Sequence, residues 1–532
     1  MENKGVSGQQ PSLSQYFSND PPSFFDELAS NKTSTSSQQM ETGDTISNQL
    51  PSNPQATPAT MNPNQVTLMN TTPASNAGHN NISHSVSNSN VALTSNSFTG
   101  GFKTPEYIEN QAELEEDMKI PDEVRNFWET PITPNGQPPL LTTPGIQTAT
   151  DLPDLIAIAV SKHLGDAELA HRKIPGVDNV TQDERGLRSL IASGCYRSAI
   201  NLTGRLLTIY GQGYGRSGQP AKHSPHSLQL WFTRLALLAK LGEYELLQKE
   251  AEPFDRLNKP DVFYEFYPEM YPGKTGSIAC FSFRLLLAEM PIYLGNPQLA
   301  LDRLSELYVI TNEIKLYFAG KNMKEAQEFW KKREFKILHA IVNCAIILKK
   351  YNLIDDILRS MIADGGDLDK EERRALFSAW GRIYLQIGDV FGAEQKFAEA
   401  RRLRKIYSQP DIRDLVDKGL ITVAQNDFPE AYATFQKALH LESGNTMILN
   451  NMGVCLLYAG KLKEAITLFE RAINLNPQKS LNESLLVNLS TLYELESNNS
   501  KNKKLNLLRL INRYKPDLNI SLEICLKLQT PN

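Results

Sequence analysis

A pattern of small and large residues that returns every 34 residues constrains this chain more than any other feature. Gly453, Ala465, Phe469 and Ala472 each lie 34 residues after a residue of the same type, and a third set lies a further 38 residues back. Small residues at helical spacing allow two helix backbones to approach closely, and the phenylalanine fills the space between one unit and the next. Residues 374–479 are therefore predicted to form three units, each made of a helix, a short turn and an antiparallel helix.

The residues expected to pack these hairpins are spread over all three units. Pro477 is expected to end the last helix, because proline lacks the backbone donor and disfavours the helical region for the residue before it. A 34-residue period with this punctuation is typical of the tetratricopeptide repeat, and the 38-residue step indicates one repeat plus a four-residue loop insertion near residues 406–409. We predict an all-α solenoid of such hairpins, packed by Trp380, Gly381, Ala393, Phe397, Ala400, Gly419, Ala431, Phe435, Ala438, Gly453, Ala465, Phe469, Ala472 and Pro477.

Four regions are expected along the 532 residues. Residues 1–150 are expected to be a disordered tail, first rich in Ser, Asn and Pro and then acidic, because such a composition cannot bury enough apolar surface to offset the entropy of ordering. Residues 151–373 are expected to form degenerate helical hairpins with a glycine-rich and an aromatic loop, followed by the three clear repeats of residues 374–479. Residues 480–532 are expected to form helices that cap an open-ended solenoid.

One stretch of the tail differs from the rest. Residues 15–28 hold four aromatic residues beside acidic ones, a combination found in peptides that dock into a partner's groove. Phe24 and Phe25 are the candidate contacts, and the alternative is that they are isolated apolar residues in a polar segment. Further along, Trp128 is either an anchor on the solenoid or a partner contact.

The charge distribution argues against nucleic-acid binding. Residues 1–150 contain 5 basic and 15 acidic residues, so this part carries a net charge of −10, and the remainder carries only +5. A protein that binds phosphate backbones needs a basic surface. The first residues lack the apolar core of a signal peptide, and no apolar run is long enough to cross a membrane. We therefore expect a cytosolic protein.

No group of residues predicts an active site, a cofactor or a metal. Residues 213–218 satisfy the dinucleotide pattern G-x-G-x-x-G, but a helical pattern rather than a strand precedes them, so a loop is expected. Residues 273–275 resemble the end of a phosphate loop but lack its earlier glycine. His223 and His226 have no third ligand nearby in the sequence, and the five cysteines are scattered, which argues against zinc and against a disulfide framework.

Two groups of residues are candidate partner contacts. Tyr264, Phe266, Tyr267 and Tyr271 lie in an aromatic stretch outside the repeat pattern, which indicates either a loop packed across the solenoid or an exposed recognition surface. The inner helices of the clear repeats are expected to present a groove. Its residues look apolar and lack a basic clamp for acidic C-terminal peptides, which favours a subunit contact or a partner helix through Asn450, Val454 and Leu457.

Several segments, including the loops outside the repeats, resemble one family. They include Gly-Gln-Gly-Tyr-Gly at residues 211–215, Tyr-Glu-Phe-Tyr-Pro at 264–268 and Tyr-Leu-Gly-Asn-Pro at 293–297, together with residues 205–207, 227–232, 234–238, 271–273, 301–304, 454–458, 460–463 and 493–497. In this order they resemble subunit 12 of the transport protein particle (TRAPP) complex, over about residues 180–528. The tail matches this family only in its polar composition and in a Phe-Phe-Asp-Glu-Leu patch.

The resemblance implies a non-catalytic scaffold subunit of a complex that tethers vesicles and exchanges Rab nucleotides in endoplasmic-reticulum-to-Golgi transport. It implies contacts with the small core and the large adaptor subunits, an indirect link to a Rab GTPase and a peripheral position at the Golgi and the intermediate compartment. It supplies no catalytic residues and no cofactor. Two alternatives remain, an unrelated repeat adaptor of the co-chaperone kind and an enzyme that uses the glycine-rich loop.

Overall fold

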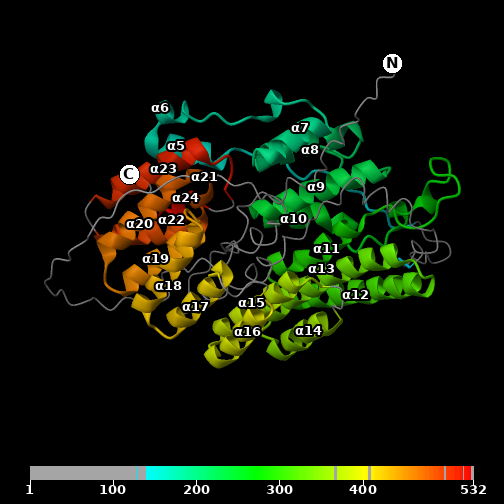
Figure 1. The fold of residues 1–532 in the computed structure, drawn as a ribbon. Helices are drawn as coiled ribbons and strands as arrows, with labels where there is room; N and C mark the ends of the chain where they lie inside the picture. Colours follow the sequence, from blue (N-terminus) through cyan, green and yellow to red (C-terminus); the bar gives the residue numbers. More distant parts are fainter. Residues whose placement is uncertain are drawn as a thin grey trace, which may run out of the picture.

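The computed structural model describes residues 127–128, 139–364, 368–404, 409–496, 499–518 and 521–528. Within these ranges the regular structure is helical, with isolated bridges in place of strands, so the predicted all-α fold is confirmed (Figure 1). The helices of four or more residues are α5 (Leu155–Leu164), α6 (Asp166–Leu169), α7 (Glu184–Ala192), α8 (Tyr196–Ile209), α9 (Pro225–Leu241), α10 (Tyr244–Ala251), α11 (Phe281–Tyr293), α12 (Pro297–Gly320), α13 (Lys324–Ile347), α14 (Tyr351–Asp364), α15 (Lys370–Ile387), α16 (Val390–Arg402), α17 (Ile412–Ala424), α18 (Phe428–Leu441), α19 (Thr446–Tyr458), α20 (Leu462–Leu475), α21 (Pro477–Ser480), α22 (Glu483–Glu496), α23 (Ser500–Tyr514) and α24 (Leu522–Cys525). Most of the tail expected to be disordered, residues 1–150, lies outside the described residues. Its last part is described, and Thr142 and Ile146 there are 0 and 3% exposed, so the expectation of disorder is wrong for this segment.

Side-chain caps explain where several repeat helices begin. Asp389, Asp427 and Asn445 precede α16, α18 and α19, and each side chain accepts a hydrogen bond from a backbone N–H in the first turn. These bonds satisfy donors that a helix cannot satisfy internally. Gly388 follows α15 with φ of 85°, in the left-handed region that glycine adopts without strain. Local chemistry therefore fixes the turns before α16 and α18 and the start of α19.

Some expected boundaries differ from the observed ones. The first clear repeat begins at Lys370, four residues before the expected position 374, because Asp369 and Glu372 form a capping box there. Most of the insertion expected near residues 406–409 lies outside the described part of the chain.

Successive helices pack in chain order and the last ones return to the first. Each hairpin contacts the next from α7 to α20, then α20 contacts α22, α22 contacts α23, and both α23 and α24 contact α5. Figure 1 shows this circuit, with the red C-terminal helices beside the cyan α5. The expectation of an open-ended solenoid is therefore wrong for this architecture. The C-terminal helices bury their apolar faces against α5 instead of ending a free stack.

We call the place where the ends meet the ring junction, which comprises α5, α6, α23, α24 and the residues that follow α6 and α23, 170–172 and 515–517. Its apolar part is a cluster in which Ile156 and Val160 of α5 pack with Leu508 and Ile511 of α23, all at most 3% exposed. Lys162 and Glu523 form an ion pair at its rim. Burial of apolar area of this kind is the main favourable term in helix association.

Arg172 is the central polar residue of the ring junction. Its guanidinium donates to the carbonyl oxygens of Asn512, Lys515 and Pro516 at 3.3, 3.0 and 2.6 Å and to the carboxylate of Asp154. Those carbonyls belong to the end of α23 and the residues after it, where a helix leaves its last acceptors unsatisfied and a cation is favoured. One side chain thus joins segments 340 or more residues apart.

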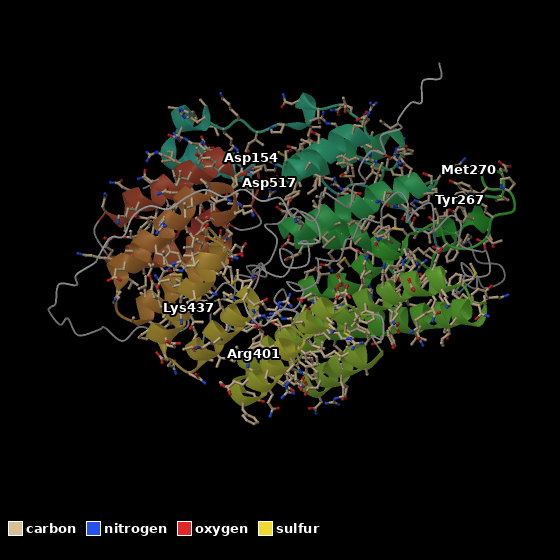
Figure 2. The ribbon with its side chains drawn as sticks, in the orientation of Figure 1. Asp154, Tyr267, Met270, Arg401, Lys437 and Asp517 are labelled. Carbon is tan, nitrogen blue, oxygen red and sulfur yellow. The ribbon has the colours of Figure 1, made fainter. Side chains whose placement is uncertain are left out.

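A buried carboxyl links the ring junction to α8. Asp517 accepts a hydrogen bond from the backbone N–H of Arg197 at 2.9 Å, and its side chain is 7% exposed. Burial raises the pKa of this carboxyl to about 6, against the lowering effects of the bond and of the Arg197 charge. Figure 2 labels Asp154 and Asp517 beside each other at this point. The contact completes the circuit from the C-terminal segment to α8.

Candidate functional site

The expected packing residues lie where hairpin helices cross. A Cβ atom added to Gly453 would come within 2.6 Å of the Phe469 ring, and the same test gives 2.6 Å for Gly419 and Phe435 and 2.5 Å for Gly381 and Phe397. Separations this short are below any carbon–carbon contact distance. The glycine of each first helix therefore provides the space that the phenylalanine of its second helix occupies.

The other expected packing positions are also at or near full burial. Their exposed fractions are at most 3% for Trp380, Ala393, Ala400, Ala431, Ala438, Ala465 and Ala472. Pro477 occupies the first position of the short helix α21, where its missing N–H costs nothing. It thus begins a helical turn after α20 has ended at Leu475.

The inner-face residues expected to contact a partner are covered by the chain itself. Asn450, Val454 and Leu457 are 0, 1 and 7% exposed. Asn488 of α22 donates to the Asn450 side chain at 3.0 Å, and Val454 and Leu457 belong to the same apolar cluster as α22 and α23. The expectation that these three side chains are available to a partner therefore needs correction, because the next hairpin of the chain packs over them.

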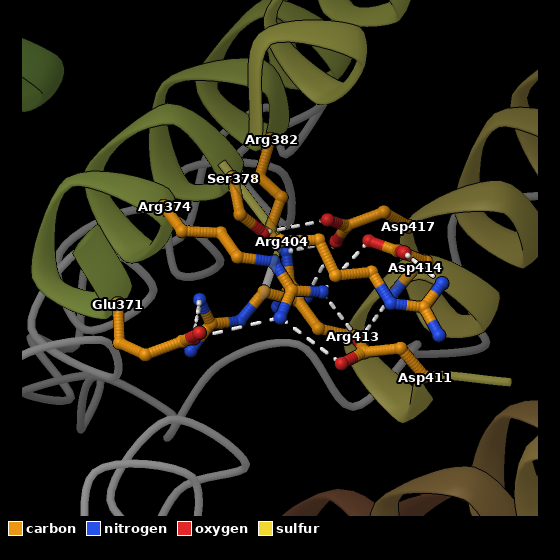
Figure 3. Close-up of polar contacts among 9 residues, drawn as sticks. All are labelled: Glu371, Arg374, Ser378, Arg382, Arg404, Asp411, Arg413, Asp414 and Asp417. Carbon is orange, nitrogen blue, oxygen red and sulfur yellow. Dashed lines mark hydrogen bonds and ion pairs between the residues drawn. The ribbon is translucent and has the colours of Figure 1, made fainter. Parts of the chain in front are cut away.

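Charged residues that the sequence analysis did not single out fill the space between α15 and α17 (Figure 3). Arg374 donates to Asp411 and Asp414, and Arg382 donates to Asp417 at 2.8 Å. Ser378, one helical turn from each arginine, also donates to Asp417, at 2.7 Å. Hydrogen bonds between charged groups are strong when both are shielded from water. The network fixes the position of one repeat relative to the next.

One arginine of this network is less well satisfied than the others. Arg413 is 3% exposed, its Nε and Nη1 have no hydrogen-bond partner, and the nearest carboxylate is that of Glu371 at 3.9 Å. Burial, together with the nearby charge of Arg374, lowers the pKa of Arg413 to about 10. By contrast, burial alone would raise the pKa of Asp411, but the hydrogen bonds and positive charge of Arg374, together with smaller effects of Asp414 and Arg413, lower it.

The aromatic stretch is mainly a packed loop. Tyr264 and Tyr267 are 4 and 7% exposed, Tyr271 packs edge-on against Tyr264, and Phe266 remains 39% exposed. The Tyr267 hydroxyl donates to the Asp261 carbonyl, and burial raises its pKa to about 12. The sequence left two alternatives for this stretch, a loop packed across the solenoid and an exposed recognition surface. Tyr264, Tyr267 and Tyr271 fit the packed loop, and Phe266 does not.

The glycine-rich loop holds another part of the chain. Residues 139–147, which we call the strap, run along it, with the Ile146 N–H donating to Gly213 and the Gly218 N–H donating to Thr143. A Cβ atom on Gly145 would come within 2.6 Å of the backbone of residues 216 and 217, so only glycine fits there. The loop that satisfied a dinucleotide pattern is therefore occupied by the strap.

Thr142 of the strap meets His223 and Asp261 in a buried cluster. The Thr142 hydroxyl lies 2.6 Å from both the His223 Nε2 and the Asp261 carboxylate, and all three side chains are 0% exposed. A hydroxyl, an imidazole and a carboxylate can activate a nucleophile. Here the threonine hydroxyl is bound directly to the carboxylate and no substrate can reach it, so the cluster fastens the strap.

Trp128 packs against the clusters around α9, α11 and α12, and the guanidinium of Arg284 lies 4.2 Å from its ring centre. This contact matches the anchor alternative. Phe24 and Phe25 lie outside the described residues.

Within the described ranges, no group of three or more His, Cys, Asp or Glu side chains is arranged to hold a metal ion. None of the helices described above combines the length and apolar character needed to cross a bilayer.

Comparisons with known proteins agree with the resemblance noted from the sequence. Residues 447–479 match the tetratricopeptide repeat model. Over 386 residues the chain is 38% identical to trafficking protein particle complex subunit 12 of Mus musculus, which covers 70% of this chain and 48% of the relative. The Homo sapiens protein of the same name is 38% identical, over 70% of this chain and 52% of the relative. The chain thus spans about half the length of the curated relatives it matches.

Similarity to solved structures is weaker. The Cut9–Hcn1 hetero-tetramer of APC/C has a TM-score of 0.29 at 13% identity, covering 69% of this chain and 59% of that one. Yeast Tom70 has a TM-score of 0.29 at 14% identity, covering 74% and 75%. With TM-scores this low, the architecture rests on the helices of this chain described above.

Proposed function

We propose that this chain, a relative of trafficking protein particle complex subunit 12 with a tetratricopeptide repeat, is a non-catalytic scaffold subunit of a TRAPP complex. The observation that carries the proposal is the 38% identity over 386 residues, which extends far beyond the single matched repeat. Because the identity covers 70% of the chain, it includes loops as well as the helices that repetition alone would make similar.

The structural features suit a scaffold. Repeat proteins bind through extended surfaces whose shape is set by the stacking of their units. In this chain the α15–α17 ion network and the ring junction hold neighbouring and distant units in one arrangement. A rigid surface loses little entropy when a partner binds. The strap fills the glycine-rich loop, which favours the scaffold over an enzyme that would use this loop.

In the proposal the chain links the large adaptor subunits to the small core that exchanges Rab nucleotides. The complex would act in endoplasmic-reticulum-to-Golgi transport, with this chain in the cytoplasm and at the Golgi only through its partners. Residues 1–126 would be the flexible tail, because the strap that follows is packed on the glycine-rich loop. Residues 151–373 and 374–479 would be the two parts of the scaffold, and residues 480–532 its closing helices. Phe24 and Phe25 in the tail and Phe266 on the packed loop would be partner contacts.

Purification of the tagged full chain from its own cells, with mass spectrometry of co-eluting proteins, tests the proposal. We expect the small core and the large adaptor subunits in near-stoichiometric amounts. Phe266→Ala and a double Phe24→Ala, Phe25→Ala variant identify the contacts, and Phe391→Ala, an equally drastic change at a 71% exposed position, is the matched control. Recovery of the folded chain without any of these subunits would end the proposal.

The matched repeat alone also occurs in adaptors of other kinds, so an unrelated co-chaperone-like adaptor is the second candidate. Such adaptors capture acidic C-terminal peptides, and the inner-face positions Asn450, Val454 and Leu457 carry no basic side chain and are buried. Titration of the full chain with a chaperone C-terminal peptide separates the two candidates. The scaffold proposal expects no binding, whereas saturable binding, abolished by amidation of the peptide, would favour the adaptor.

A further inference from the structure

A cavity of about 170 Å³ lies between the loop that follows α10 and the helices α11 and α12. Its wall combines charged and apolar side chains, namely Trp128, Asp255, Arg256, Asn258, Arg284, Leu287, Ala288, Arg303, Glu306, Leu307 and Ile310. An engineered protein cavity of roughly 150 Å³ is large enough to bind benzene. This one can therefore hold a small organic group, and its charged side chains determine which kind.

Arg284 is a buried cation in this wall, and in the described part of the chain it has no carboxylate partner. It is 9% exposed, and its terminal nitrogens donate to the carbonyl oxygens of Arg256 and Leu257 and to the hydroxyl of Ser277. Its Nε has no hydrogen-bond partner. Burial lowers the pKa of Arg284 to about 9. Buried charges in proteins are ordinarily paired with an opposite charge.

Arg303 lines the same cavity and is also incompletely satisfied. It donates to the Leu287 carbonyl at 3.3 Å and to the Asp255 carboxylate at 3.2 Å, and its Nε has no partner. The two carboxylates of the wall are each already engaged, Asp255 by Arg303 and Glu306 by Arg256 at 2.7 Å. Among the described residues that line the cavity, three arginines and two carboxylates leave one positive charge uncompensated.

The loop beside the cavity adopts a conformation that side chains rarely take. Asp255 and Leu257 have φ of 44° and 56°, in the region that favours glycine. Arg284 stabilises this path, because it binds the carbonyls of the two residues Arg256 and Leu257. Strained backbone of this kind persists where the surrounding structure determines it and clusters at ligand sites. The cavity thus lies beside a loop whose unusual path is held by Arg284.

We propose that this cavity binds a carboxylate carried on a small apolar group. The monoanion balances the uncompensated charge of the wall and accepts hydrogen bonds from Arg284 and Arg303, while its apolar group packs on Leu287, Ala288 and Ile310. The same chemistry is offered by a free acid and by the terminal carboxylate of a peptide that ends in an apolar residue. The site is independent of the proposed scaffold role, because all its residues come from this chain.

Titration of the full chain with benzoate and with benzamide, followed by calorimetry, tests the proposal. The two molecules share size and shape, and only benzoate carries the charge. We expect saturable binding of benzoate and none of benzamide. A peptide with a C-terminal phenylalanine, compared with its amidated form, identifies the source. Tighter binding of the peptide acid than of benzoate assigns the site to a partner's terminus, and the reverse order assigns it to a free acid.

Two variants verify the location. Arg284→Gln should weaken benzoate binding at least about tenfold, the effect of one charged hydrogen bond, and Ala288→Phe should abolish it by filling the cavity even if Arg284→Gln does not fold. Arg359→Gln, with a 69% exposed side chain far along the chain, is the control and should bind as the wild type does. Equal binding of benzoate and benzamide, no binding of any acid, or unchanged binding by Ala288→Phe would overturn the proposal.

Discussion

The clear repeats and the ring junction both join helices, and they do so by opposite means. From α15 to α20 each hairpin is closed by a glycine facing a phenylalanine, an apolar contact that occurs three times with nearly the same geometry. The ring junction depends instead on single polar residues, with Arg172 bound to three backbone carbonyls and Asp517 buried beside Arg197.

The difference concerns how stability is distributed. In a repeat, the interacting residues are close in sequence. The free energy of folding is therefore about the sum of a contribution from each unit and one from each contact between neighbouring units. At the junction the contacts close a circuit of more than 300 residues, so they form only after the helices between them are in place. Loss of a repeat contact should weaken the whole array, and loss of a junction contact should first open the circuit.

Removal of a repeat phenylalanine should have the largest effect. Phe469→Ala leaves a cavity at a 1% exposed position between α19 and α20, so we expect a loss of about 3–5 kcal/mol in the free energy of unfolding. Urea unfolding followed by circular dichroism measures it. Phe391→Ala, at a 71% exposed position on α16, is the control and should change stability by about 0.5 kcal/mol or less. Similar losses for both variants would contradict the packing role.

The buried carboxyl of Asp517 should make the junction sensitive to pH. Because burial raises its folded-state pKa from 3.8 to about 6, the folded chain holds this proton more tightly than the unfolded chain, and ionisation opposes folding by about 3 kcal/mol. The wild type should therefore lose stability relative to Asp517→Asn as the pH rises from about 4 to above 6. Arg197, Arg172, Asp154 and Cys195 also face this carboxyl or influence its surroundings.

Thermal or urea unfolding of both proteins between about pH 4 and pH 7 measures this difference. The amide introduced by Asp517→Asn would keep an acceptor for the Arg197 N–H, so the comparison isolates the charge. A stability difference that stays constant over this range would show that the junction carboxyl has an ordinary pKa.

Arg172→Met should lower the free energy of unfolding by about 2–3 kcal/mol, because carbonyls at the end of α23 lose a charged donor. Hydrogen exchange should increase in α5 and α23 while α15 to α20 keep their protection. Arg185→Met, which removes a 74% exposed arginine, is the matched control and should behave as the wild type. Equal loss of protection in the repeats would mean that the junction and the repeats unfold together.

Gly453→Ala should have the smallest effect of the four, about 1–2 kcal/mol, because overpacking against Phe469 exceeds the gain in helix propensity. Adding Phe469→Leu should then cost less in the alanine background than in the wild type, since the smaller side chain leaves room for the new methyl group. A double-mutant cycle on purified protein measures this coupling. Additive effects would place the two residues out of contact.

The repeats, their helices and their turns could be predicted from the sequence because their signals are local. The three repeat units expected over residues 374–479 correspond to the hairpins of α15 and α16, α17 and α18, and α19 and α20. The glycine positions that admit a phenylalanine ring were visible as a spacing alone. A sequence pattern with a fixed period predicts packing well when each helix packs against the helix next to it along the chain, as it does in a repeat.

Features that depend on long-range contacts were not predictable in the same way. Nothing in the composition of residues 139–147 indicates that Thr142 would meet Asp261, 119 residues away. That Arg172 closes the circuit could be predicted only if the position of α23 beside it were already known. The α15–α17 network is visible in the sequence as a spacing. Arg374, Ser378 and Arg382 recur every fourth residue, and Asp411, Asp414 and Asp417 every third. This spacing produces hydrogen bonds and ion pairs only because α15 and α17 face each other, which the sequence alone does not show.

Closure of the circuit changes how the molecule would carry a pulling force. In an open stack, load applied to two partners travels through every intervening interface in series, so the weakest interface sets the limit. In this chain the helices form a closed circuit, so two partners bound to different helices would be connected through the repeats α15 to α20 and also through the ring junction with Arg172 and Asp517. A pulling force would divide between these two connections, and failure of an interface in one would leave the other intact.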